Sequence, residues 1–194
     1  MVKKFNLIVG VTGLARSGKD TVARMLAEAL KIEEFTMSDL LAEDLKRRDL
    51  EPTKENMLEL AKEWRYREGA TAFSEKTLAR LKGPNAIVSG VRTPADVINF
   101  KENTRKFALV SVAAPENVRF ERKTVQDPFT FNEFFHRDRE DAREQGMDLV
   151  LKMAEYKITN DGSLKDLEKQ VAKAVKDLKL KSFIKPAKPK KSKK

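Results

Sequence analysis

The sequence predicts a three-layer α/β fold in which helices flank a five-stranded parallel sheet. Apolar runs alternate with amphipathic helical patterns along the chain, as strands and crossover helices do in a parallel sheet. The chain has 194 residues, of which 40% are hydrophobic, and this is enough to bury one proper core.

Five apolar runs are the candidate strands. They span residues 5–11, 35–37, 86–89, 107–112 and 156–159. Capping signals mark several helix starts, because a short hydroxyl side chain accepts hydrogen bonds from the free N–H groups of a first turn. These signals stand at Thr53, Thr93, Thr130 and Ser163. The helix after Ser163 is expected to bury Leu164, Leu167, Val171, Ala174, Val175 and Leu178.

The pattern predicts one domain over residues 1–180 with two helical additions. An insertion of about residues 38–85, wholly helical in pattern, follows the second candidate strand. An arginine-rich helical stretch of about residues 119–143 has the character of a small lid. Trp64, in the insertion, is expected to pack, whereas Arg65 and Arg67 either grip an acceptor or lie on a solvated helix end.

Residues 181–194 form a separate, lysine-rich tail. They hold seven lysines and no acid, and the formal charge of +10 falls to +3 without them. A Lys/Pro segment cannot bury apolar surface, so we expect the tail to be disordered. It serves either to keep the chain soluble, which we favour, or to make a weak, salt-sensitive contact with nucleic acid.

The composition excludes several classes of protein. The absence of cysteine rules out disulfides and thiolate metal sites and fits a cytoplasmic location. No stretch approaches the ~20 apolar residues of a membrane span, and the first strand begins too early to leave room for a signal peptide. We therefore expect no membrane partner.

The most informative motif lies between the first candidate strand and the helix that follows it. Gly13, Gly18 and Lys19 have the spacing of a phosphate-binding P-loop, whose N–H groups, helix dipole and lysine together hold phosphates. The motif predicts that ATP and Mg²⁺ are the cofactors. The predicted nucleotide-binding residues in this stretch are Gly13, Ala15, Arg16, Ser17, Gly18, Lys19, Asp20 and Thr21.

The motif departs from the usual pattern directly after the lysine. That position normally carries Ser or Thr, whose hydroxyl binds Mg²⁺, but here it is Asp20, and Thr21 follows. Two arrangements remain open. Asp20 holds Mg²⁺ through a water molecule, or Thr21 turns inward to do so.

Further candidates lie at the carboxyl ends of the other strands, where α/β sheets bind ligands. Arg92 follows the third strand and can hold a phosphate with its guanidinium fork. Asp39, near the end of the second strand, either accepts a proton or positions Mg²⁺, or is an ordinary first-turn acid. From the lid we expect Arg119, Arg122 and Arg137 to neutralise phosphate charge. His136, the only histidine, has no partner set for a metal or a triad.

With these motifs the chain resembles the P-loop nucleoside monophosphate kinase superfamily, and the three-layer P-loop NTPase fold follows from this. In adenylate kinases the arginine at the position of Arg92 holds the acceptor phosphate. The closer resemblance is to an archaeal P-loop family related to dephospho-CoA kinase, carried by Gly90 to Arg92, Val118 to Arg122, Phe134 to Asp138 and Tyr156 to Ser163.

The same resemblance implies two details of the site. The segment after the last strand commonly lies against adenine, which suggests Asn160 and Gly162. Relatives often carry Asp at the position of Ser89, where it belongs to a Walker B acid. The implied activity is ATP-dependent phosphorylation of a nucleoside monophosphate. The alternatives are dephospho-CoA kinase-like activity, or a P-loop ATPase or RNA-associated factor.

Overall fold

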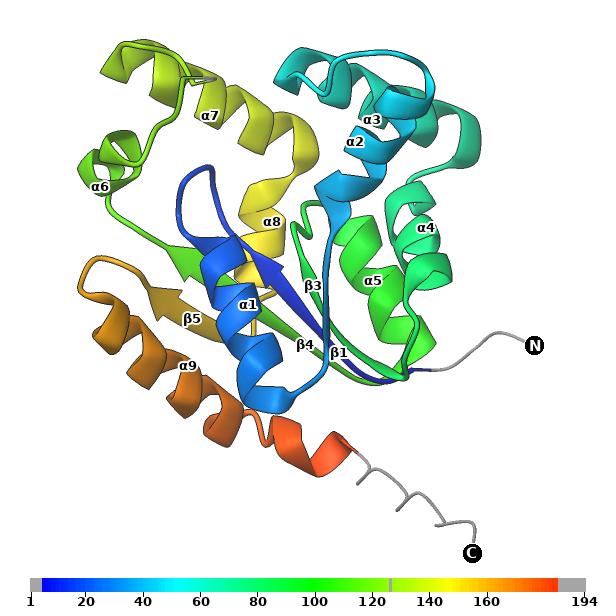
Figure 1. Cartoon of the computed structure of the whole chain (residues 1–194), viewed down its shortest axis with the longest axis vertical. Helices are drawn as coiled ribbons and strands as arrows, with labels where there is room; N and C mark the ends of the chain where they lie inside the picture. Colours follow the sequence, from blue (N-terminus) through cyan, green and yellow to red (C-terminus); the bar gives the residue numbers. More distant parts are fainter. Residues whose placement is uncertain (1–4, 126, 185–194) are drawn as a thin grey trace, which may run out of the picture.

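The computed structural model describes residues 5–125 and 127–184 of the chain. Their strands form one parallel sheet in the order β2-β3-β1-β4-β5, which confirms the predicted fold (Figure 1). The second strand begins two residues before the predicted run, and Met37 opens a helix instead of ending that strand. The strands are β1 (Phe5–Thr12), β2 (Glu33–Thr36), β3 (Asn85–Ser89), β4 (Thr104–Ala113) and β5 (Tyr156–Thr159).

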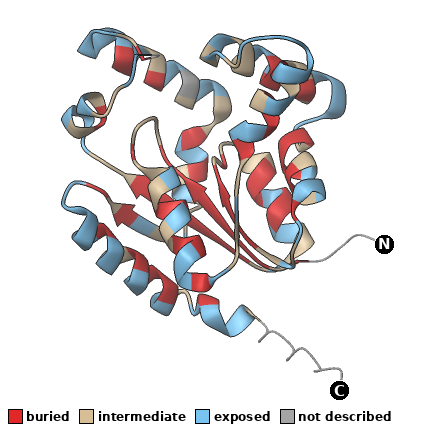
Figure 2. Cartoon of the chain, viewed as in Figure 1, coloured by how far each residue is buried: buried red, intermediate tan, exposed pale blue. Residues whose placement is uncertain are grey.

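Helices cover both faces of the sheet and make two cores. On one face, α1 (Lys19–Leu30) and α9 (Leu164–Asp177) pack on Val9, Val11 and their neighbours. On the other, α5 (Pro94–Asn103) and α8 (Met147–Lys152) pack on Ile8, Val88 and Leu109. This division follows from the two-residue period of strand side chains. Figure 2 shows the buried residues concentrated in the sheet and the inner helix faces.

Three helices lie between β2 and β3, in the region of the predicted insertion. They are α2 (Met37–Arg47), α3 (Lys54–Glu68) and α4 (Ala72–Arg80). Trp64 is buried, and its ring centroid lies 5.1 Å from that of Phe73, so it packs as expected. The insertion thus has its own apolar interior, which continues into the core beneath it.

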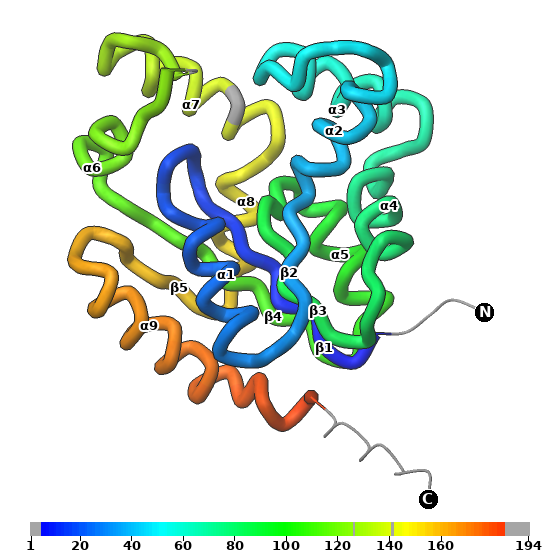
Figure 3. The backbone as a smooth tube through the Cα atoms, viewed as in Figure 1, coloured from blue at the N-terminus to red at the C-terminus, as the bar shows by residue number. Residues whose placement is uncertain are grey.

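The predicted lid also has helices at both ends. A short α6 (Glu116–Glu121) precedes the connection, and α7 (Phe131–Gln145) follows it. Figure 3 shows the lid and the insertion rising from the same edge of the sheet, on either side of the loop between β1 and α1. Segments far apart in sequence therefore converge on this loop.

The capping signals are confirmed at all four predicted positions. Thr53, Thr93, Thr130 and Ser163 each accept a hydrogen bond from the N–H group three residues on, and Thr130 completes a capping box with Glu133. One expected core residue is wrong. Leu164 is 66% exposed because it is the first residue of α9, where the helix has not yet reached the sheet.

The ordered structure continues past residue 180, contrary to the predicted boundary. A 3-10 helix, η1 (Leu180–Phe183), buries Leu180 completely, and Ile184 packs on the same core. Phe183 and Ile184 make the start of the tail less polar than its lysines suggest. Residues 185–194, which hold the other tail lysines, lie outside the described residues. In the described part of the chain no helix has the length and apolar character needed to cross a bilayer.

We expect Leu180→Ala to lower the free energy of unfolding by about 2–5 kcal/mol, because it empties a fully buried site. Urea denaturation of the full chain measures this. The matched control is Leu164→Ala, which should change stability by no more than about 0.5 kcal/mol. Equal effects of the two substitutions would show that η1 does not belong to the folded domain.

Candidate functional site

The predicted P-loop lies between β1 and α1, and its backbone is tightly enclosed. Gly18 has φ +89°, and a Cβ there would lie 2.1 Å from Asn160 Nδ2. Only glycine meets both demands. Asn160 Nδ2 in turn donates to Ser17 O at 2.9 Å, so the residue after β5 supports the loop directly. Asn160 was predicted to lie near the adenine, and its side chain holds the phosphate loop.

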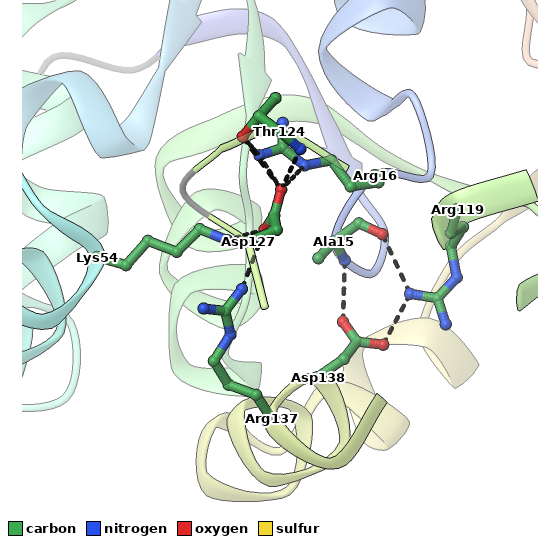
Figure 4. Close-up of polar contacts among 8 residues, drawn as sticks. All are labelled: Ala15, Arg16, Lys54, Arg119, Thr124, Asp127, Arg137 and Asp138. Atoms are coloured by element: carbon green, nitrogen blue, oxygen red, sulfur yellow. Dashed lines mark hydrogen bonds and ion pairs between the residues drawn. The ribbon is translucent and has the colours of Figure 1, made fainter. Parts of the chain in front are cut away.

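A second support, which we call the loop clamp, consists of Ala15, Arg119 and Asp138 (Figure 4). Arg119 Nη1 donates to Ala15 O at 3.1 Å and to Asp138 Oδ2 at 2.7 Å. Asp138 Oδ1 accepts from Ala15 N at 3.2 Å. Arg119 and Asp138 are both buried. Arg119, predicted to act on phosphate, therefore contacts the loop main chain and Asp138 in this structure.

Asp138 was not among the site residues predicted from the sequence. It stands in a run of alternating charges that is typical of a solvated helix surface. Helical spacing was the available signal, because Phe134 lies four residues earlier and Phe135 three residues earlier. Both phenylalanines are buried, so Asp138 shares their face of α7.

A cavity of about 520 Å³ opens beside the loop, between the insertion and α7. Cationic side chains from every surrounding part line it, namely Lys19, Lys54, Arg65, Arg92 and Arg137. Its apolar wall comes mainly from the insertion and includes Leu41, Met57, Leu58, Ala61 and Phe73. Acidic side chains line it as well, namely Asp20, Glu55, Asp96, Asp138, Glu140 and Glu144. The cavity thus joins a phosphate-binding loop to a chamber of mixed charge with one apolar side.

The electrostatics of the cavity floor centre on Lys19. Burial lowers the pKa of Lys19, although the neighbouring Asp20 works in the opposite direction. Burial also acts to raise the pKa of Asp20, but Lys19 and a hydrogen bond from Ser89 bring it below its ordinary value. Lys19 Nζ and Asp20 Oδ2 lie 3.2 Å apart. Asp20 lines the cavity and Thr21 does not.

Arg65 and Arg92 both line the cavity. The Arg65 guanidinium lies 5.0 Å from the Phe73 ring centroid, and its buried Nε has no hydrogen-bond partner among the described residues. Burial lowers the pKa of Arg65. The charge of Asp96 acts to raise this pKa, and the like charge of Arg92 acts to lower it. Arg67, the other candidate on α3, pairs with Glu63 at the surface instead.

Unpartnered polar atoms gather around the phosphate loop. Arg122 Nη2 donates to Asn160 O at 3.3 Å, while its buried Nη1 has no partner in the described part of the chain. The same is true of the hydroxyl oxygens of Thr12 and Ser17. A buried polar group without a partner is costly. These atoms therefore fit a bound group that carries many oxygen acceptors, such as a polyphosphate.

A single carboxylate draws together three parts of the molecule. We call this the Asp127 cluster, and it comprises Arg16, Lys54, Thr124, Asp127 and Arg137 (Figure 4). Arg16 Nε donates to Asp127 Oδ2 at 2.7 Å, and Arg137 Nη2 donates to Oδ1 at 3.0 Å. Lys54 forms an ion pair with the same Oδ1. The loop, the insertion and the lid are thereby joined through one side chain.

The Asp127 side chain is fully buried, whereas its three cationic partners remain about a third exposed. Burial alone would raise the pKa of Asp127. The hydrogen bonds from Lys54 and from the Thr124 N–H group, together with Arg16, outweigh this and hold the pKa far below its ordinary value. The carboxylate is therefore firmly ionised where it sits.

The remaining predicted residues lie farther from the cavity. Asp39 is exposed on α2 and is not part of the lining, although partial loss of hydration, Glu43 and Asp20 raise its pKa. Gly162 is exposed near the start of α9. His136 forms a surface pair with Glu140. Among the described residues no group of three His, Cys, Asp or Glu side chains could hold a metal ion.

Comparison with known proteins agrees with this geometry. Residues 12–127, more than half of the chain, match the family described as AAA domain. The chain is 34% identical to the UPF0200 protein of Hyperthermus butylicus over 171 residues, which covers 84% of this chain and 89% of that protein. The chain belongs to the UPF0200 family. A second member, from Aeropyrum pernix, is 33% identical over 177 residues, which cover 90% of this chain and 95% of that protein.

Solved structures with the same fold include small-molecule kinases. The shikimate kinase of Acinetobacter baumannii, in complex with shikimate, has a TM-score of 0.62 at 20% identity. The matched region covers 92% of this chain and 97% of the shikimate kinase chain. A gluconokinase from Sinorhizobium meliloti has a TM-score of 0.50 at 16% identity. The matched region covers 92% of this chain and 99% of the gluconokinase chain. At this identity the likeness establishes that this UPF0200 protein has a P-loop kinase-like fold.

We expect Asp127→Asn to lower the free energy of unfolding by about 1.5–3 kcal/mol at neutral pH, since hydrogen bonds to a charged group are lost. The folded-state pKa lies below the ordinary value near 4, so the ion pairs stabilise above that pH and are lost as the pH falls toward the folded pKa. The stability difference between wild type and variant, measured by urea denaturation, should therefore shrink below about pH 4.

The control is Asp177→Asn, which removes a carboxylate from an exposed pair with Lys173 and should cost less than about 1 kcal/mol. A difference between wild type and Asp127→Asn that stays constant from neutral to acidic pH would contradict the proposed origin of the effect.

Proposed function

We propose that this protein is an ATP-dependent small-molecule kinase that transfers the γ-phosphate to a phosphorylated acceptor, for which a nucleoside monophosphate is our first choice. The observation that carries the proposal is the cavity of about 520 Å³ that connects Lys19 of the phosphate loop with Arg65 and Arg92. A kinase needs such a connection, because the donor phosphate and the acceptor must meet in one enclosed space.

The donor end suits ATP. Loop N–H groups, the start of α1 and Lys19 supply the positive character that β- and γ-phosphates require. The unpartnered Arg122 Nη1 and Ser17 Oγ add hydrogen-bond donors at the same place. Mg²⁺ would neutralise phosphate charge there, and Asp20 is the carboxylate that lines the cavity next to Lys19.

The acceptor end suits a molecule with a phosphate and a flat or apolar body. Arg65 and Arg92 offer two guanidinium groups for the phosphate, and the Arg65 Nε has no other partner in the described chain. The apolar wall of Met57, Ala61 and Phe73 offers a surface for a base or another apolar body.

Asp39 is not placed to act as the base for a hydroxyl acceptor. A hydroxyl acceptor, such as that of dephospho-CoA, needs a base to take its proton, whereas a phosphate oxygen is already ionised. Asp39, the base suggested by the sequence, is exposed and outside the cavity lining. Arg137 lines the cavity from the lid, and its proposed role is to help neutralise the charge of the transferring group.

The decisive experiment measures ADP release from Mg-ATP with a panel of nucleoside monophosphates, deoxynucleotides, dephospho-CoA and RNA. Turnover that depends on one small phosphorylated acceptor supports the proposal and identifies the substrate. Turnover that ignores every small acceptor, or rises only with RNA, supports the ATPase or RNA-associated alternative. The lysine tail of the full chain must be kept in this assay.

We expect Lys19→Ala to reduce acceptor-dependent turnover by at least about 10²-fold, because a preorganised cation at the phosphates is lost. The unfolding transition should stay cooperative. The control is Lys173→Ala, whose exposed ammonium pairs with Asp177 far from the cavity. Turnover by Lys19→Ala at the level of this control would show that the phosphate loop takes no part in the reaction.

We expect Arg92→Ala to raise the acceptor KM or lower kcat by about tenfold or more, with the KM for ATP nearly unchanged. The reason is that Arg92 lies on the acceptor side of the cavity. Arg67→Ala, which removes an exposed arginine of the insertion, serves as the control. Equal losses toward ATP and acceptor would count against the assignment of Arg92.

A further inference from the structure

One hydrogen bond links the two positions that depart from the usual P-loop pattern. Ser89 Oγ donates to Asp20 Oδ1 at 2.5 Å. Ser89 is the last residue of β3 and is completely buried, and Asp20 is the second residue of α1. β3 pairs with β1 so that Ser89 stands beside Val11, next to the start of the phosphate loop. The sheet register therefore brings the two side chains together.

P-loop NTPases usually place the same two chemical groups the other way round. The residue after the lysine is Ser or Thr, and the acid is an Asp at the end of a neighbouring strand. Here the carboxylate follows the lysine and the hydroxyl ends the strand. The pair still contains one hydroxyl and one carboxylate joined by a hydrogen bond, but the donor and the acceptor have changed places.

We propose that Asp20 and Ser89 have exchanged the usual roles, so that Asp20 is the carboxylate that binds the Mg²⁺ of the nucleotide and Ser89 holds that carboxylate in place. The proposal rests on the nucleotide binding proposed above and adds the identity of the metal-binding pair. It also removes the need for an acid at position 89. Thr21, the other candidate, is outside the cavity lining.

The contacts of Asp20 suit this role. Its Oδ1 accepts from Ser89, and its Oδ2 faces Lys19 Nζ at 3.2 Å. Because Lys19 is the side chain that binds nucleotide phosphates, Oδ2 is the oxygen that its movement would release. Mg²⁺ commonly uses only one or two protein carboxylates and takes its other ligands from water and phosphate. A single carboxylate fixed at one oxygen fits that demand.

The test compares Asp20→Ser, Ser89→Asp and the double variant that carries both. The readout is the affinity for ADP measured by titration calorimetry with and without Mg²⁺, which needs no acceptor and no turnover. We expect Mg²⁺ to strengthen ADP binding to the wild type. Each single variant should lose about tenfold of this enhancement, and the double variant should recover most of it because it has the usual arrangement.

The control is a second Ser–Asp pair in the same chain. Ser163 Oγ donates to Asp166 Oδ2 at 2.6 Å at the exposed start of α9, away from the cavity. Exchanging Ser163 and Asp166 should leave the Mg²⁺ enhancement unchanged. A merely structural role of the Asp20–Ser89 bond would change ADP affinity equally with and without Mg²⁺, and that result would overturn the proposal.

Two further results separate this inference from the proposed function. Full Mg²⁺ enhancement in Asp20→Ser, or a double variant no better than Asp20→Ser, overturns the exchange and leaves nucleotide binding intact. Failure of the wild type to bind ADP overturns both. Failure of every acceptor in the turnover assay, with the expected calorimetric pattern, overturns only the kinase.

Discussion

The whole site depends on holding one short stretch of main chain, residues 13–18, in a shape that the chain would not keep by itself. A loop that turns its N–H groups toward one point brings the positive ends of several dipoles together, which repel one another. Its glycines also allow the main chain many other conformations. Neighbouring elements restrict it from outside. On the β5 side, Asn160 holds the loop by donating a hydrogen bond to Ser17 O. On the lid side, Arg119 and Asp138 hold it through both main-chain polar groups of Ala15.

This arrangement explains why conspicuous charged residues do not all face the cavity. Arg119 is buried with Asp138, and a buried ion pair is retained only when its hydrogen bonds are satisfied. Its geometry meets that condition, because the guanidinium also binds a main-chain oxygen. The pair thus couples the position of α7 to the shape of the loop.

The Asp127 cluster adds a different kind of link. Arg16, Lys54 and Arg137 belong to the loop, the insertion and the lid, and their charges would repel one another without an anion between them. Asp127 supplies that anion. Any phosphate that approaches Lys54 or Arg137 from the cavity must therefore compete with a carboxylate that is already ionised and buried. The charge of the cavity is balanced internally before a ligand arrives.

The fold was largely predictable from sequence because its signals are local. The apolar runs show the strands, and Thr53, Thr93, Thr130 and Ser163 show where helices begin, since a cap needs only the residues of one turn. The short α8 gave no such signal. The end of the domain was misplaced because Leu180 and Ile184 are single apolar residues among lysines, and only the tertiary structure shows that β1 and α9 leave a site for them.

The site was predictable only in part, because its contacts join residues far apart in the chain. Lys19 and Arg92 stand in recognisable motifs, whereas Asp127 and Asp138 acquire meaning only when the lid folds over the loop. The same reason changes the interpretation of Ser89. Taken alone it is the loss of an acid, but the pairing of β3 with β1 sets it against Asp20, and the chemistry of a pair cannot be judged from one of its members. A substitution at either position is neutral or damaging according to what stands at the other, so the two residues are best regarded as one unit of the phosphate loop.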